Sequence, residues 1–157
     1  MQAQWSPLDL SRHPAVLPTV QTVGRVSPRK IVVSSRAMGR RDKVTVLVYD
    51  TLAEMRAAAS AYNGTDNHDS IGVTQVACWV QTGRTKSVIV RLARDYIGTL
   101  VISHEIHHAA TALYGAHVGD RISTARHLTH CNEPFAHLFS DLLARLVDRL
   151  YELGYYP

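Results

Sequence analysis

Residues 96–114 read YIGTLVISHEIHHAATALY and carry the strongest structural signal in the chain. Apolar residues recur there every three or four positions, which predicts an amphipathic helix with Asp95 as its cap and Gly115 as its end. His104 and His108 stand four residues apart, so their side chains lie on one face, one turn apart. The apolar residues around them predict that this face is turned inward: Ile97, Leu100, Val101 and Ala112.

Two imidazoles at this spacing can bind one metal ion, with nitrogen–zinc distances of about 2.0–2.1 Å. Glu105 is displaced around the helix, where its carboxylate can take a proton from a metal-bound water. His107 is also one turn from His104, but only the pair with His108 leaves Glu105 in that role. The HExxH spacing therefore predicts a zinc site with His104 and His108 as ligands and Glu105 as general base. A histidine-rich surface helix without metal is the plainer alternative, but inward imidazoles need polar partners.

A catalytic zinc site has three protein ligands and one open position, so a third ligand must come from elsewhere. The longer motif HExxHxxGxxH is absent, because Thr111 and Tyr114 stand at its later positions. We expect Glu133 to be the third ligand, with His130 and His137 as alternatives. The dipole at the start of a helix also favours an acid at this position without any metal. Small residues on the same helix would allow a close approach to the HExxH helix: Ala136, Ser140 and Ala144.

Four strands are predicted from apolar and β-branched runs bounded by turn residues. They span residues 30–34, 44–49, 71–80 and 87–92, and residues 81–84 join the last two as a hairpin.

Two further helices are predicted, over residues 51–62 and 133–153. Their start and stop signals are the capping box of Thr51 with Glu54, then Asn63-Gly64, Asn132 and Gly154. Strands therefore precede the two long C-terminal helices. This order predicts an α+β domain with helices packed on a small, mostly antiparallel sheet.

At residues 104–108 and 132–137, His-Glu-Ile-His-His and Asn-Glu-Pro-Phe-Ala-His, the chain resembles the gluzincin group of zincin metallopeptidases. It is also similar to small bacterial and phage-encoded zincins, including the ImmA/IrrE-like peptidases. The resemblance covers residues 44 to about 150 and implies a zincin-like fold and one zinc ion held by His104, His108 and Glu133, with Glu105 as general base. One position differs, since His137 stands where thermolysin-like enzymes carry an aspartate; Asp141 lies one turn further on.

These features lead us to expect a zinc-dependent hydrolase, and specifically a peptidase, in which metal-activated water attacks a carbonyl. A peptide or protein substrate would lie as an added strand along a sheet edge, either residues 71–80 or residues 87–92. Polar residues near the HExxH motif are candidates for stabilising the oxyanion: Tyr114, His117, Arg121, His127 and His130. The alternative is a zinc-binding interaction module without catalysis, in a regulatory or phage structural role. Glu105 favours the enzyme, because a structural site has no need of it.

The composition is that of an ordinary globular protein: 157 residues, 46% hydrophobic and 19% charged. No apolar run is long enough for a membrane span, and the first ten residues do not look like a secretory signal. Cys78 and Cys131 show no framework spacing, so we expect two free thiols and a cytoplasmic protein.

The net charge of +4 is unevenly distributed. Residues 1–43 hold eight Lys or Arg against Asp9 and Asp42, and the rest of the chain is slightly acidic. We therefore divide the chain into a basic N-terminal arm with one short strand, residues 1–43, and a zincin-like metallohydrolase domain, residues 44–157. Such an arm can make weak contact with nucleic acid, although a solvated surface segment is the simpler interpretation.

Overall fold

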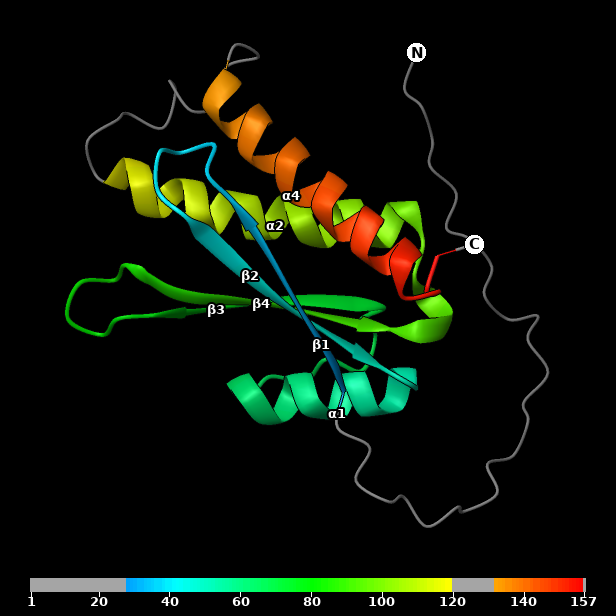
Figure 1. The fold of residues 1–157 in the computed structure, drawn as a ribbon. Coiled ribbons are helices and arrows are strands. Elements are labelled where there is room, and N and C mark those ends of the chain that lie inside the picture. The colour runs from blue at the N-terminus through cyan, green and yellow to red at the C-terminus, as the bar shows by residue number, and fades with distance from the viewer. Residues whose placement is uncertain (1–27, 120–131, 157) are drawn as a thin grey trace, which may run out of the picture.

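The computed structural model describes residues 28–119 and 132–156. It has a four-stranded sheet with helix α1 (Leu52–Asn63) on one face and helices α2 (Thr99–Val118) and α4 (Glu133–Glu152) on the other (Figure 1). The α+β class predicted from the sequence is confirmed. Of the described helices, none is long and apolar enough to cross a bilayer.

The sheet is mixed. Its strands are β1 (Arg29–Ser35), β2 (Asp42–Tyr49), β3 (Gly72–Cys78) and β4 (Thr85–Ala93), in the spatial order β1-β2-β4-β3. The two outer pairings are antiparallel, as expected, whereas β2 and β4 run parallel in the centre. A parallel pair needs a long crossover, and the chain supplies one through α1 and β3. As a result, β3 is an edge strand and β4 is an interior strand.

Helix α1 follows its sequence signals closely. The Thr51 hydroxyl accepts a hydrogen bond from the Glu54 amide at 3.2 Å, and the Glu54 carboxylate accepts one from the Thr51 amide at 3.1 Å. Gly64 ends the helix in the left-handed conformation, with φ of 68°. The predicted capping box is therefore confirmed.

Helix α2 begins later than predicted. Asp95 does not cap it, because Arg94–Tyr96 forms a separate 3-10 turn, η1, and Gly98 precedes the first residue of α2. Gly98 has no side chain with which to cap a helix, so the sequence gives no signal at the true start. The C-terminal segment instead packs on this end, where the hydroxyls of Thr99 and Tyr156 are hydrogen-bonded.

The end of α2 is also later than predicted, because the helix continues through Gly115 to Val118 and stops at Gly119. In the last turn, His117 Nε2 donates to the buried carboxylate of Asp42 at the start of β2, over 2.7 Å. This contact opposes the cost of about 1 kcal/mol that a glycine adds inside a helix.

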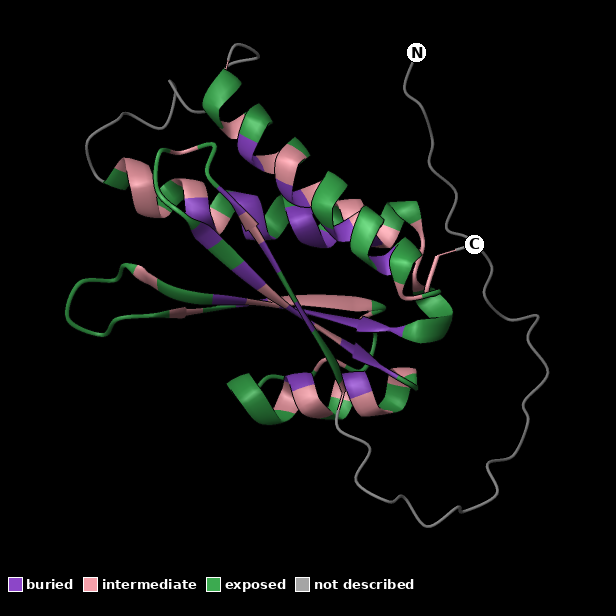
Figure 2. Ribbon diagram, in the orientation of Figure 1, coloured by how far each residue is buried: buried purple, intermediate pink, exposed green. Residues whose placement is uncertain are grey.

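Helix α4 agrees with the sequence. The Asn132 side chain accepts a hydrogen bond from the Phe135 amide at 3.3 Å, and Gly154 follows the end of the helix with φ of 70°. Leu138, Leu142, Leu146 and Leu150 are fully buried against α2 and the sheet (Figure 2). This packing fixes α2 above the sheet.

Part of the basic segment belongs to the sheet. β1 pairs with β2 along its whole length, and Ile31 and Val33 lie in the main core. The basic residues from Arg36 to Lys43 therefore surround the β1–β2 turn. Residues 1–27 lie outside the described part of the chain.

Candidate metal centre at the edge of the sheet

The imidazoles of His104 and His108 converge. Their Nε2 atoms are 3.1 Å apart, and both rings are exposed to solvent. Two nitrogens bound to one tetrahedral zinc ion are separated by about 3.3 Å, given nitrogen–zinc distances of 2.0–2.1 Å. The two imidazoles share a hydrogen bond in this structure, and their separation is also close to that of two ligands to one ion.

The buried face of α2 is displaced by about one residue from the face predicted, so that prediction is wrong. The buried stripe contains Ile102, Ile106, Ala109 and Leu113, together with Glu105, whereas His104 and His108 lie at its border and Leu100 is 79% exposed. The middle of the helix is apolar on two neighbouring stripes. The prediction rested on the flanking apolar residues Ile97, Leu100, Val101 and Ala112.

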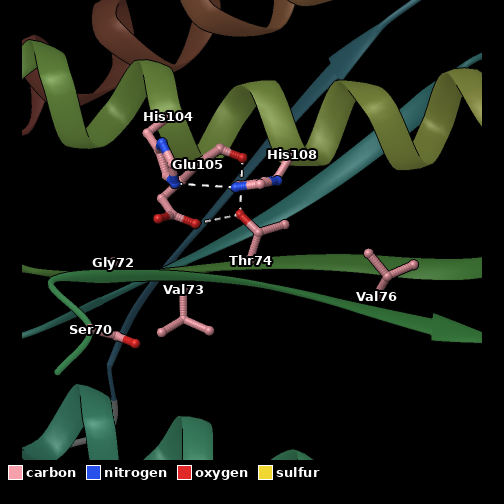
Figure 3. Close-up of a pocket in the computed structure, with 8 residues that line it drawn as sticks. All are labelled: Ser70, Gly72, Val73, Thr74, Val76, His104, Glu105 and His108. Atoms are coloured by element: carbon pink, nitrogen blue, oxygen red, sulfur yellow. Dashed lines mark hydrogen bonds between the residues drawn. The ribbon is translucent and has the colours of Figure 1, made fainter. Parts of the chain in front are cut away.

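Glu105 is the buried acid of the site, with only 5% of its surface exposed. The hydroxyl of Thr74, on β3, lies 2.7 Å from Glu105 Oε2 and 2.9 Å from the Glu105 carbonyl oxygen (Figure 3). That hydroxyl has one hydrogen, which the two acceptors must share. Thr74 thus ties both the carboxylate and the backbone of the HExxH helix to the edge strand.

Gly72 makes room for this carboxylate. A Cβ atom at position 72 would lie 2.9 Å from Glu105 Cγ and 2.9 Å from Val101 Cγ1, closer than carbon atoms pack in proteins. Glycine therefore allows α2 to lie against β3. A glycine inside a strand is a signal of such a close approach, and the sequence contained it.

Replacing Gly72 by alanine should destabilise the fold by about 1–3 kcal/mol, the usual range for an overpacked core position. Urea unfolding of the two proteins measures this directly. The matched control is Gly115→Ala in α2, where an added Cβ meets nothing within 4 Å. That change should stabilise the protein by about 0.5–1 kcal/mol, because alanine is the better helix former. Equal stability of the Gly72→Ala and parent proteins would contradict the close approach.

His104, Glu105 and His108 border a pocket of about 340 Å³ between α2 and the edge strand β3. Ser70, Gly72, Val73, Thr74 and Val76 form its floor, and His104 and His108 lie above it (Figure 3). The Nε2 atoms and the Glu105 carboxylate thus face the same space, which is open to solvent. The arrangement can hold a cation at the imidazoles and accept a proton at the carboxylate.

His107 is not part of this pocket. Its ring makes edge contacts with Phe135 and Phe139 of α4, at centroid distances of 5.5 and 6.0 Å. Tyr114 also packs against Phe135, and His117 is held by Asp42. Among the oxyanion candidates, neither Tyr114 nor His117 borders the pocket. The other three, Arg121, His127 and His130, lie outside the described residues.

Glu133 is not brought to the imidazole pair. It is 74% exposed, and its carboxylate lies 3.7 Å from Nε2 of His137, one turn along α4. Within residues 28–119 and 132–156, no group of three His, Cys, Asp or Glu side chains could hold a metal ion. Ligation by Glu133 would require the first turn of α4 to approach β3, and it stays a prediction. His130, the alternative, lies outside those ranges.

Comparing Glu133→Ala with His130→Ala should identify the third ligand. If Glu133 completes the site, its removal should weaken zinc binding by tenfold or more, since a coordinate bond is lost. Competition with a chromogenic chelator gives the affinities. His137→Ala, which removes only the neighbour of Glu133, should change the affinity less. Loss of zinc in His130→Ala but not in Glu133→Ala would instead indicate a three-histidine site.

Two further features bear on the sequence predictions. Cys78 is a free, exposed thiol at the end of β3, while Cys131 lies outside the described residues. Thr74 and Gly72 were not among the candidate site residues, because their roles depend on the packing of α2 against β3.

No protein-family model, curated protein or solved structure matches the chain.

Proposed function

We propose that the protein is a zinc-dependent hydrolase that cleaves peptide bonds. The observation that carries this proposal is the convergence of the His104 and His108 Nε2 atoms, 3.1 Å apart, beside the buried carboxylate of Glu105. A structural metal site needs neither the buried acid nor an open pocket. Both are features of a site that performs chemistry.

The two imidazoles are donors that suit zinc. Neutral imidazole nitrogens are common zinc ligands, and the exposed pair can be reached from solvent without rearrangement of the core. The third ligand in this proposal is Glu133, with His130 and His137 as alternatives. A zinc ion bound here would polarise a substrate carbonyl and lower the pKa of a water molecule.

Three residues of the protein have separate roles in this proposal. Glu105 accepts a proton at its carboxylate, which faces the pocket below the imidazoles. Thr74 keeps that carboxylate in place through the 2.7 Å contact, and Gly72 leaves it the necessary space. The burial of Glu105 limits the number of waters that compete for its oxygens.

The substrate surface in this proposal is the outer edge of β3, residues 72–78, which has no neighbouring strand within the described part of the chain. Its backbone groups can pair with an extended peptide, which would then pass through the pocket below His104 and His108. Val76 is 39% exposed at this edge and can contact an apolar side chain of the peptide. β4, the other strand considered, is an interior strand and offers no free edge.

The test is cleavage of unfolded protein. The zinc-loaded full chain is incubated with a mixture of chemically unfolded proteins, and new amino termini are identified by mass spectrometry. We expect cleavage that stops with a chelator and returns with zinc. A protein that holds zinc and cleaves nothing in the mixture would favour the non-catalytic binding module.

A further inference from the structure

A second and larger pocket lies further along α2, toward the C-terminal end of the helix. Its volume is about 870 Å³, and it is bordered by the β3–β4 turn, the C-terminal half of α2 and Arg40 of the β1–β2 turn. Nothing in the proposed chemistry uses this pocket. Its position and its charge point to a role in choosing the substrate.

The pocket continues the line of the metal centre along α2. Thr111 and Gly115, which border it, follow His104 and His108 on the same stripe of the helix. The near side of the pocket, at the midpoint of Thr111 and Gly115, lies about seven helical residues beyond the midpoint of the histidine pair, which is about 10 Å at 1.5 Å per residue. An extended peptide covers that distance in about three residues.

The charge of the pocket is positive. Arg40 and Arg84 border it from two different turns, and no carboxylate is among the described residues that line it. Within the described ranges, the Arg84 guanidinium has no carboxylate within 4 Å; the other cation of the hairpin, Lys86, lies over the ring of Trp79. Arg84 is therefore free to bind an incoming anion.

Two local features oppose the binding of an anion, but neither is sufficient to cancel the positive charge of the pocket. The C-terminal end of α2 carries a partial charge of about −0.5, which is smaller than the charge of either guanidinium. Asp42 forms an ion pair with Arg40 at 3.6 Å, and Arg40 Nε also lies 3.2 Å from Nε2 of His117, so among the described residues the charge of Arg40 is partly balanced whereas that of Arg84 is not. The Arg40 side chain remains 63% exposed.

We propose that this pocket selects peptides with an acidic side chain about three residues from the scissile bond. The carboxylate would lie between Arg84 and Arg40 while the peptide backbone pairs with β3. Planar guanidinium groups bind carboxylates through two parallel hydrogen bonds, so they can fix the register of the peptide. The inference rests on the proposed function, since it assumes that a peptide occupies the edge of β3.

Binding of two peptide probes tests the inference without requiring cleavage. The probes are fluorescein-labelled twelve-residue peptides of serine, threonine, valine and glutamine, which differ only in a central pair of glutamates or lysines. Their affinities for the zinc-loaded Glu105→Gln protein are measured by fluorescence anisotropy. We expect the glutamate probe to bind roughly tenfold more tightly, since attraction of one probe and repulsion of the other both contribute. Arg84→Glu should remove or reverse this preference.

The control is Arg29→Glu, which makes the same change of charge on an exposed residue of β1 that borders neither pocket. It should leave the preference almost unchanged. Equal binding of the probes, or an identical response to Arg29→Glu and Arg84→Glu, would overturn the inference. Cleavage of unfolded proteins without an acidic preference would also overturn it, while leaving the hydrolase intact. An acidic preference in a protein that cleaves nothing would contradict the hydrolase alone.

Discussion

Replacing Glu105 by glutamine is expected to reduce hydrolysis by roughly a hundredfold or more, the usual loss when a general base is removed. Glutamine keeps the shape of the side chain but cannot accept the proton. Its amide oxygen can still accept the hydrogen bond from Thr74, so the contact between α2 and β3 should survive. Zinc content and thermal stability should therefore stay close to those of the parent. The rate is measured on the unfolded-protein mixture, with zinc determined on the same samples.

Glu152→Gln is the matched control, because it makes the same chemical change at an exposed residue that pairs with Arg149 at the end of α4. It should keep full activity. Loss of zinc from Glu105→Gln would show that Glu105 is a ligand, and the assignment of a general base would then be wrong. Full activity in Glu105→Gln would contradict the proposed chemistry directly.

The double variant His104→Ala, His108→Ala should lose its zinc. The parent should contain about one zinc per chain, and the variant less than about a tenth of that, because two of three coordinate bonds are removed. Both rings are exposed, so their removal leaves no cavity in the core. Elemental analysis after purification without chelator gives the ratio, and circular dichroism checks that the variant is folded.

His107→Ala tests whether zinc binds to the His104–His108 pair specifically or to any histidine in this part of α2. His107 lies next to His108 in the sequence, but its ring contacts Phe135 and Phe139. This variant should keep its zinc and lose some stability, since ring contacts with α4 disappear. Zinc at full occupancy in the double variant, or its loss in His107→Ala, would show that the metal binds elsewhere.

The fold was predictable where side chains signal their own conformation. Thr51, Glu54 and Asn132 cap helices through short-range hydrogen bonds, so the structure agrees with the sequence there. The start of α2 was missed, because Gly98 has no side chain and Asp95 offered a plausible cap instead. The parallel pairing of β2 with β4 was missed as well, because an apolar strand pattern does not specify its neighbour or its direction.

The site was predictable in its helical part only. The spacing of His104 and His108 is local, and their nitrogens do converge in the structure. The burial of Glu105 and its contact with Thr74 depend on which strand passes below α2, and Thr74 is separated from Glu105 by 31 residues. No local pattern reports a contact of that kind. Glu133 was inferred from its own helix, and its distance from the pair depends on how α4 packs.

Among the described strands, β3 has a neighbour on one side only, and such an edge can pair with another copy of the chain. Val76, Trp79 and Val80 are exposed at or next to this edge, where a strand of another copy could pair. The irregular register at Ala77/Cys78 limits this, since it restricts regular pairing to a short segment. The positive charge of Lys86 near Trp79 also repels a second copy of the same hairpin. Access for the proposed peptide substrate and resistance to aggregation would therefore compete at the same few residues.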